Sequence, residues 1–250
     1  MQGRTILLTR DRAQSAEFES EVARRGGRVV CVPMIVITDP DSWRACDEAL
    51  KGIDRYNGLV FTSINAVEKF IGRAEVKRVQ GSTLNRLTTY VVGERTKAEL
   101  EHHGLYAAII PGDYSASALA KTLVESDVRD RQFLHPCGNL KREEIGVRIA
   151  ELGGRVDEVM VYKTEGPDRN AAEAIVPLLK SGVVDVITFA SPSAVKNYAG
   201  LLGTSRPDVR IAVIGHTTAE AMEELGWRPD IMATQSTMSG LLEAIDSFFE

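Results

Sequence analysis

The chain has 250 residues, of which 44% are hydrophobic and 26% are charged, and its formal net charge is −5. These values are ordinary for a globular protein, and the length allows one large domain or two modest ones. The sequence contains no basic block, which argues against a general nucleic-acid binder, although a locally positive cleft is compatible with it.

The cysteines and the amino terminus indicate the cell compartment. Cys31, Cys46 and Cys137 lie far apart and form no CxxC motif, so we expect neither a disulfide framework nor a structural zinc site. A reducing cytosol fits this pattern best. The amino terminus has no apolar leader segment, and no apolar run approaches the length of a membrane span. We therefore expect a cytoplasmic protein without a membrane partner.

Short apolar runs alternate with segments of helical periodicity along the chain. In chain order we expect a strand over 6–9, a helix over 13–25, a strand over 28–32, an extended segment over 33–39, a helix over 41–50, a strand and helix within 58–71, a strand over 88–92, a helix that stops near Gly104, a strand over 107–110 and a helix over 116–124. A second round follows, with strands over 132–135, 155–160, 185–189, 210–214 and 230–233 and helices over 142–152, 171–180, 193–202, 218–225 and 238–249.

This alternation is typical of an α/β protein with parallel sheets that are covered on both faces. About ten strands are more than one small doubly wound sheet holds comfortably, so we expect two domains. The chain also repeats itself: Gly26-Gly27 returns as Gly153-Gly154, and the segment around Ser63 returns around Ser191. If A denotes the segment around Gly26-Gly27 and B the segment around Ser63, the order along the chain is A, B, A′, B′, where A′ contains Gly153-Gly154 and B′ contains Ser191. The pattern allows A to pair with B, or A with B′ and B with A′; the second alternative needs two adjacent crossings, for which 33–39 and 161–167 are well placed.

Small and hydroxyl residues follow the expected strands in both halves. Ser63 and Ser191 stand where a helix N-cap is expected, and Pro192 suits the first helical position. A helix start also offers backbone amides and a positive dipole end to an anion, although for either serine alone plain capping is the commoner role. These strand ends are Thr9-Arg10, Thr62-Ser63, Gly93 with Thr96, His135-Pro136, Ser191, Gly215-His216-Thr217 and 234–237. They suit the binding of a polycarboxylate more than bond-breaking by a positioned acid or base.

Common catalytic fingerprints are missing. The sequence has no GxGxxG after a strand, no Walker A lysine motif and no GxSxG elbow. His102 and His103 lie near the end of an expected helix, so we expect them to be solvated helix-terminal residues rather than ligands. His135 and His216 are placed at the carboxyl ends of expected strands, where doubly wound folds bind their ligands, but such positions also hold plain loop residues.

An ordered set of short motifs resembles the uroporphyrinogen-III synthase family over nearly the whole chain. The matching pieces are Phe61-Thr62-Ser63-x-Asn65-Ala66-Val67, Val92-Gly93-x-x-Thr96, Pro111 with Ser115-Ala116-x-x-Leu119, Arg142 before Gly153-Gly154, Val161-Tyr162-x-Thr164, Ser191-Pro192-Ser193-Ala194-Val195, Ile214-Gly215-x-Thr217-Thr218-Ala219 and Thr237-x-x-Gly240-Leu241-x-x-Ala244-Ile245. Each piece is weak by itself, whereas the ordered set is specific. Ile64 and Ala190 are the departures from the family pattern, because they occupy turn positions at which family members often have polar or small residues.

The resemblance implies two flavodoxin-like doubly wound parallel-sheet domains joined by a two-segment linker. It thereby selects the pairing of A with B′ and B with A′. We expect domain 1 to comprise 1–35 and 167–250, domain 2 to comprise 40–160, and the linkers to be 36–39 and 161–166.

The resemblance also implies the reaction: hydroxymethylbilane, a linear tetrapyrrole with eight carboxylates, is dehydrated and cyclised with inversion of its last ring to give uroporphyrinogen III, without cofactor or metal, in a cleft between the domains. Loss of water leaves an azafulvene, and its capture on ring D gives a spiro intermediate that reopens and recloses. Tyr162 matches the family's cleft tyrosine and is the expected catalytic residue; otherwise it is an amphipathic hinge residue. Arg10, Lys163 and Arg142 are candidate cations for carboxylates, although surface solvation is the commoner role.

Taken with the strand ends, the expected substrate-binding residues are Arg10, Thr62, Ser63, Asn65, Gly93, Thr96, Lys163, Ser191, Pro192, Ser193, Gly215, Thr217 and Thr218. We expect a monomer that meets the preceding and following enzymes of tetrapyrrole synthesis and binds no nucleic acid. The alternative of a different class is a non-catalytic two-domain module that closes over a small polyanion.

Overall fold

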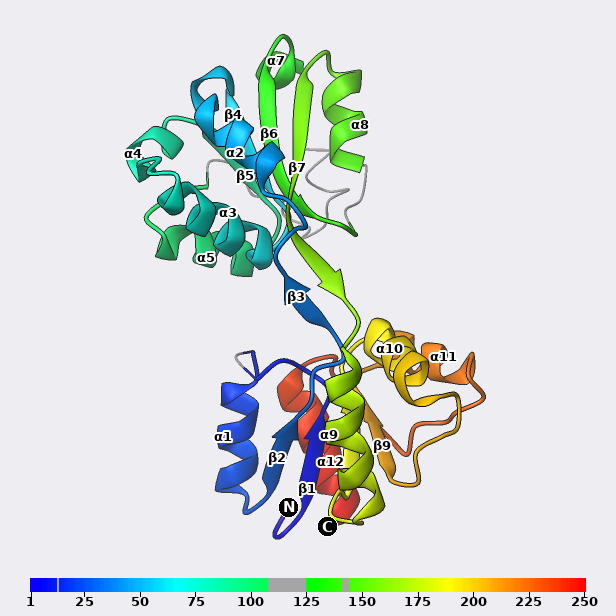
Figure 1. The fold of residues 1–250 in the computed structure, drawn as a ribbon. Coiled ribbons are helices and arrows are strands. Elements are labelled where there is room, and N and C mark those ends of the chain that lie inside the picture. The colour runs from blue at the N-terminus through cyan, green and yellow to red at the C-terminus, as the bar shows by residue number, and fades with distance from the viewer. Residues whose placement is uncertain (13, 108–124, 141–143) are drawn as a thin grey trace. The chain divides into compact units, whose positions relative to one another are not determined.

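The computed structural model describes residues 1–12, 14–107, 125–140 and 144–250 (Figure 1). Its strands are β1 Thr5–Leu8, β2 Arg28–Cys31, β3 Val36–Thr38, β4 Gly58–Phe61, β5 Thr88–Val91, β6 Gln132–Gly138, β7 Arg155–Glu165, β8 Val186–Phe189, β9 Arg210–Val213 and β10 Ile231–Met232. Its α-helices are α1 Ala16–Arg24, α2 Arg44–Lys51, α3 Ile64–Val76, α4 Gly81–Leu84, α5 Glu94–His102, α7 Glu125–Val128, α8 Glu144–Glu151, α9 Arg169–Lys180, α10 Pro192–Leu202, α11 His216–Glu223 and α12 Met238–Phe249. A short 3₁₀-helix covers Ile53–Arg55.

The chain forms two units, each with its own sheet. Unit 1 comprises Met1–Val36 and Glu165–Glu250, and unit 2 comprises Ile37–Thr164. The chain therefore passes twice from one unit to the other, once after Val36 and once after Thr164. Each unit contains mainly parallel strands with helices between them, so the fold is α/β as the alternating pattern predicts.

The sheet of unit 1 has the strand order β10-β9-β8-β1-β2, and its neighbouring strands run parallel. Thus β1 and β2, from the beginning of the sequence, share a sheet with β8, β9 and β10 from its end. This is the pairing of A with B′ that the family resemblance implies. The strand order changes direction between β1 and β8, which is where doubly wound sheets open a crevice for ligands.

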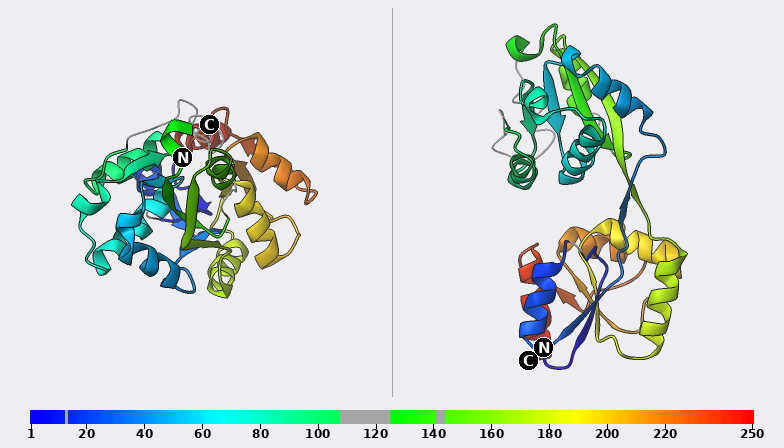
Figure 2. Two further views of the ribbon diagram at one scale, coloured as in Figure 1. Left: turned by 90° about the horizontal axis from the view of Figure 1, so that it is seen from above. Right: turned by 60° about the vertical axis from the view of Figure 1, so that its left-hand side comes forward.

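Both faces of the unit 1 sheet are covered by helices, as the right-hand view of Figure 2 shows. On one face, Leu7 and Ile187 pack with side chains of α9, α10 and α11. On the other, Ile6 and Leu8 pack with α1 and α12. Successive residues of β1 therefore point to opposite cores, which explains why this strand is apolar throughout rather than alternating.

Unit 2 is built in the same way, with the strand order β3-β7-β6-β4-β5. Strands β4 to β7 pair in parallel. Phe61 and Leu134 pack with α2, α3 and α5 on one face, while Val60 and Phe133 pack with α7 and α8 on the other. Two separate apolar cores thus hold each sheet between helical layers.

The internal repeat is visible in the way two helices end. After α1, Gly26 has φ +78° and the Gly27 amide donates to the Val22 carbonyl at 2.9 Å. After α8, Gly153 has φ +78° and the Gly154 amide donates to the Ile149 carbonyl at 2.9 Å. Both are Schellman-type ends, in which glycine is favoured because other residues suffer a steric cost at positive φ.

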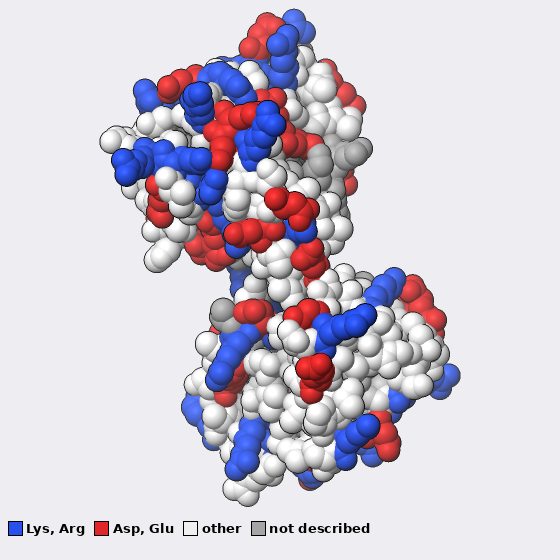
Figure 3. Space-filling view, viewed as in Figure 1, with Lys and Arg blue, Asp and Glu red and all other residues white. Residues whose placement is uncertain are grey.

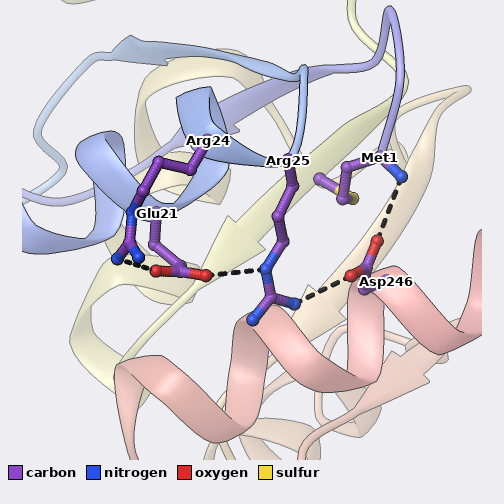
Figure 4. Close-up of polar contacts among 5 residues, drawn as sticks. All are labelled: Met1, Glu21, Arg24, Arg25 and Asp246. Atoms are coloured by element: carbon purple, nitrogen blue, oxygen red, sulfur yellow. Dashed lines mark hydrogen bonds and ion pairs between the residues drawn. The ribbon is translucent and has the colours of Figure 1, made fainter.

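In unit 1 the first residue is tied to the last helix (Figure 4). The Met1 ammonium donates to Asp246 Oδ1 at 3.0 Å, and Arg25 Nη1 donates to Asp246 Oδ2 at 2.8 Å. Arg25 also bonds Glu21, which in turn pairs with Arg24. The hydrogen bond from the ammonium is the main reason that the pKa of Asp246 is lowered. The cluster therefore joins the start of the chain, α1 and α12.

Some elements differ from those expected. Residues 161–165, expected as an extended connecting segment after a strand over 155–160, are continuous with that strand as the end of β7, because Tyr162 still pairs with β6. The prediction that His135 ends a strand is wrong, since it lies within β6. Pro136 does not end that strand, because the pairing of β6 with β4 has stopped at Leu134 and the missing amide costs no ladder bond there. The expected helix over 116–124 and most of the expected strand over 107–110 lie outside the described residues.

The surface carries charges of both signs. On the face drawn in Figure 3, Lys and Arg are interspersed with Asp and Glu over both units. The face shown therefore carries no basic stripe of the kind that a nucleic-acid backbone requires. Within the residues described, no helix is both long and apolar enough to cross a membrane.

Candidate functional site

The predicted site residues of unit 2 lie at the carboxyl edge of its sheet. Thr62 and Ser63 follow β4, Gly93 follows β5, and Tyr162 lies near the end of β7. Because these strands are parallel, their carboxyl ends meet at one edge. The sheet thus brings together segments that are widely separated in sequence.

Ser63 begins α3 as a true N-cap. Its backbone is extended, with φ −155° and ψ 152°, and its Oγ accepts a hydrogen bond from the Ala66 amide at 3.1 Å. Ser191 does the same for α10 in unit 1, where it accepts from the Ala194 amide at 3.2 Å and Pro192 is the first helical residue. The capping predicted for both serines is confirmed. The remaining first-turn amides of each helix stay available to an anion.

Tyr162 reaches the cap of α3. Its Oη lies 3.1 Å from Ser63 Oγ, and either hydroxyl can be the donor. The ring is half-buried against the core that α3 covers. Since Ser63 Oγ already accepts the Ala66 amide, it can donate its own proton to Tyr162, which leaves the phenolic proton for another acceptor. This pair of hydroxyls is a direct side-chain contact between two predicted site residues.

Other predicted residues of unit 2 differ in exposure. Gly93 precedes α5 with φ +86°, so its conformation favours glycine. Thr96 is 5% exposed and faces the interior, whereas Thr62 and Asn65 are half-buried. A ligand at this edge would therefore meet Thr62, Asn65 and the backbone around Gly93 rather than the Thr96 hydroxyl.

The candidate cations already have partners. Lys163 Nζ donates to Asp41 Oδ1 at 2.8 Å. Arg10 bonds Gln14 Oε1 through Nε and Nη2, both at 3.3 Å. Arg142 lies outside the described residues. A carboxylate of a ligand would have to compete with these existing partners for Lys163 and Arg10.

Unit 1 presents a corresponding row. Ser191 and the exposed Ser193 follow β8, and the exposed Thr217 follows β9. Gly215 begins α11, and a Cβ there would lie 2.5 Å from Ser236 Oγ. Thr218 is 1% exposed, so like Thr96 it belongs to the interior. The residues predicted from the strand ends of unit 1 therefore include side chains that face solvent and side chains that are buried behind the turn.

Sequence reasoning did not single out Asn139. Its Oδ1 accepts the Thr164 amide at 2.8 Å, and its Nδ2 donates to the Thr164 carbonyl at 3.2 Å. The side chain therefore extends the pairing of β6 with β7 past the last residue of β6. No sequence pattern indicates this contact, because it depends on the register of two strands.

A surface groove between α2 and α3 contains none of the predicted residues. Asp47 in this groove binds Arg73 through two hydrogen bonds of 2.7 Å and also pairs with Lys77 at 2.7 Å. The bonds from Arg73, followed by those from Lys77, hold the pKa of Asp47 at about 2 despite partial burial. Elsewhere in the described ranges, no group of three or more His, Cys, Asp or Glu side chains could hold a metal ion.

Comparisons with known proteins agree with this arrangement. The family model described as "Uroporphyrinogen-III synthase HemD" matches residues 16–243. A uroporphyrinogen-III synthase from Chlorobaculum parvum is 30% identical over 232 residues, which cover 92% of each chain. One from Synechococcus elongatus is 29% identical over 254 residues, covering 98% of this chain and 96% of the relative.

Solved structures show the same fold at lower sequence identity. A mutant uroporphyrinogen III synthase from Thermus thermophilus matches with a TM-score of 0.64 at 17% identity, covering 98% of both chains. The Helicobacter pylori uroporphyrinogen-III synthetase matches with a TM-score of 0.61 at 16% identity, covering 98% of this chain and 99% of the other. The family model and the Chlorobaculum relative extend over most of the sequence, and the chain therefore belongs to the uroporphyrinogen-III synthase family of enzymes.

Proposed function

We propose that the chain converts hydroxymethylbilane to uroporphyrinogen III by a cofactor-free dehydrating cyclisation that inverts ring D, in the biosynthesis of tetrapyrroles. The observation that carries this proposal, beside family membership, is the pairing of Tyr162 Oη with Ser63 Oγ at the start of α3. The pairing supports the proposal because Tyr162, as the proposed proton donor, lies beside a helix start, where the dipole favours the negative charge left when the proton is donated.

The substrate's carboxylates are bound by the carboxyl edges of the two sheets. In unit 2 the contacts come from the cation Lys163, from Thr62, Ser63 and Asn65, and from the turn of Gly93 and Thr96. In unit 1 they come from Arg10 and from the starts of two helices, namely Ser191, Pro192, Ser193, Gly215, Thr217 and Thr218. Backbone amides and hydroxyls supply most of the donors, so the bound chain is folded by many modest contacts. Thr96 and Thr218, being buried, shape these turns.

Tyr162 starts the chemistry. It donates its phenolic proton to the terminal hydroxyl of the substrate, the C–O bond breaks with its electron pair on oxygen, and water leaves. The neighbouring pyrrole nitrogen supplies the electron pair of the new double bond and gives up its N–H proton, which restores the phenol by way of solvent. The products of this step are water and an azafulvene.

Ring closure follows without further acid catalysis. The substituted α-carbon of ring D attacks the azafulvene carbon and forms a spiro intermediate. The bond from this carbon to the methylene of ring C then breaks and leaves an azafulvene on ring C. The unsubstituted α-carbon of ring D attacks that methylene carbon and loses its proton, so the macrocycle closes with ring D inverted. The intermediate is intrinsically reactive, so the protein mainly selects the carbon that attacks.

Ser63 supports the acid. When it donates to Tyr162 Oη, it stabilises the negative charge that develops on the phenolic oxygen as the proton leaves. The amino-terminal end of α3, which Ser63 caps, adds a favourable electrostatic field at the same oxygen. The serine thus serves the helix and the tyrosine together.

The setting of this activity is proposed as well. The enzyme works as a cytoplasmic monomer that receives its substrate from the preceding enzyme of tetrapyrrole synthesis. Its functional domains are 1–35 with 167–250 and 40–160, and the connecting segments are 36–39 and 161–166. The division of the described residues into two units supports these boundaries.

A coupled assay tests the proposal. Freshly generated hydroxymethylbilane is given to the purified protein, and the uroporphyrin isomers are separated after oxidation. We expect protein-dependent type III isomer. Type I isomer alone, which forms spontaneously, would overturn the proposal and favour a catalytically silent polyanion-binding module.

A further inference from the structure

The contact between Tyr162 and Ser63 spans a strand. In the order β7-β6-β4, strand β6 separates Tyr162 from the end of β4, after which Ser63 follows. Alternate neighbours in a sheet lie about 10 Å apart, which is too far for a direct contact between backbones. The side chain of Tyr162 must therefore lie across the end of β6. The last residue of β6 is Gly138.

A β-bulge turns Tyr162 toward this path. Cys137 pairs with Met160, but Gly138 pairs with Tyr162, so Val161 of β7 has no opposite residue in the register. Val159 and Val161 are buried in the core under α3, whereas Met160 is 41% exposed. Simple alternation would send Tyr162 to the Met160 side. Because of the bulge, it packs instead against the same core as Val161.

Gly138 leaves the space that the ring then occupies. A Cβ at residue 138 would lie 2.5 Å from Tyr162 Cζ, 2.6 Å from Cε2 and 2.9 Å from Oη. The φ of Gly138 is not in the left-handed region, so its backbone conformation would accept other residues. Space for the phenol, rather than backbone freedom, is what glycine provides here.

We propose that Gly138 is a positioning residue for catalysis, which holds the Tyr162 hydroxyl against Ser63 by letting the phenol lie over the end of β6. The proposal rests on the proposed function of Tyr162 as proton donor. Asn139 secures the same arrangement from the other side, because its two bonds to Thr164 fix the register of β7 just beyond the bulge.

A double-mutant cycle tests this. Gly138→Ala is compared with Tyr162→Phe and with the double variant, and kcat, KM and the melting temperature are measured for each. Gly72→Ala is the matched control, because Gly72 lies in α3 with open space around its Cβ position. We expect Gly138→Ala to lower kcat by about the same factor as Tyr162→Phe, about tenfold or more, with KM changed far less. In the Tyr162→Phe background, Gly138→Ala should leave kcat unchanged, since the hydroxyl it would displace is absent.

Fluorine NMR gives a readout without substrate. The six tyrosines are replaced by 3-fluorotyrosine, and the Tyr162 resonance is identified by its loss in Tyr162→Phe. Gly138→Ala should shift this resonance, and Gly72→Ala should not. If Gly138→Ala does not fold, Asn139→Ala is used, because Asn139 is exposed and its loss should shift the same resonance and lower kcat to a smaller extent.

The outcomes separate the two proposals. An unshifted resonance, or a kcat loss that multiplies with that of Tyr162→Phe, would overturn the role of Gly138 while the synthase function stands. Absence of type III isomer from the wild-type protein would instead overturn the proposed function, whatever the resonance does.

Discussion

The hydroxyl oxygens of Ser63 and Tyr162 lie 3.1 Å apart, although the two residues are 99 positions apart in the sequence. Ser63 lies between β4 and α3 and caps the helix, whereas Tyr162 belongs to β7, which is not adjacent to β4 in the sheet. The contact therefore joins the start of a helix to a strand two positions away from β4. It links the stability of a helix to the position of the proposed proton donor, and the two effects can be separated by mutation.

Replacing Ser63 by Ala removes the cap and the partner of Tyr162 together. We expect a loss of about 1 kcal/mol in the free energy of unfolding, as is usual for an N-cap. We also expect kcat to fall, because the phenolic oxygen loses a hydrogen bond that stabilises its developing charge. Chemical denaturation and steady-state kinetics measure the two changes. Asp168→Ala is the control: it removes the cap of α9, where Asp168 accepts the Ala171 amide at 3.3 Å, and should cost similar stability with kcat unchanged.

Replacing Ser193 by Asp tests the binding edge of unit 1. Ser193 is exposed in the first turn of α10, so a carboxylate there should stabilise the helix by about 0.5 kcal/mol through the macrodipole. The same charge should repel the substrate's carboxylates and raise KM by about fivefold or more. A melting curve checks the expected gain in stability, and steady-state kinetics check the expected rise in KM. Ser205→Asp, in the loop after α10, adds the same charge away from this edge; an equal rise in KM there would contradict the assignment.

The lowered pKa of Asp47 implies that the free energy of unfolding depends on pH. Hydrogen bonds from Arg73 and Lys77 lower its pKa from 3.8 to about 2, so its contribution is present above pH 3.8 and is lost as the pH falls toward 2. Because water reaches the pair, we expect Asp47→Asn to cost about 1 kcal/mol near neutral pH. The difference between wild type and variant in urea unfolding should shrink as the pH falls below 3.8 and be mostly lost by about pH 2. Asp54→Asn is the control, since Asp54 is 82% exposed and should have no measurable effect. A difference for Asp47→Asn that is as large at pH 2 as near neutral pH would contradict this account.

Much of the fold could be predicted from local patterns. The apolar runs that become β1, β4 and β8 are buried on both sides, and this makes them continuous and easy to recognise. The caps Ser63 and Ser191 could be predicted because an N-cap depends on its own helix alone. Strand pairing depends on long-range contacts, and for that reason the pattern left it open until the family resemblance selected one alternative.

The site was less accessible from the sequence. The hydroxyl residues that follow strands were all predicted as possible ligand contacts, but Thr96 and Thr218 face the interior. The sequence pattern at the start of a helix is the same whether a given side chain is buried or exposed. His135 was misplaced because Pro136 suggested the end of a strand that continues. The bulge before Gly138 and the contact of Asn139 with Thr164 arise from the register of β6 and β7, which no local pattern encodes.

The most direct test of this account is the kcat of Tyr162→Phe in the formation of type III isomer, measured beside Tyr106→Phe, whose tyrosine is 72% exposed. We predict that Tyr162→Phe lowers kcat by about tenfold or more, at the low end for a general acid because the intermediate is reactive, while KM and the melting temperature change little. Slower turnover should also let spontaneous type I isomer accumulate. A kcat for Tyr162→Phe equal to that of Tyr106→Phe would show that the Tyr162 hydroxyl does not donate the proton.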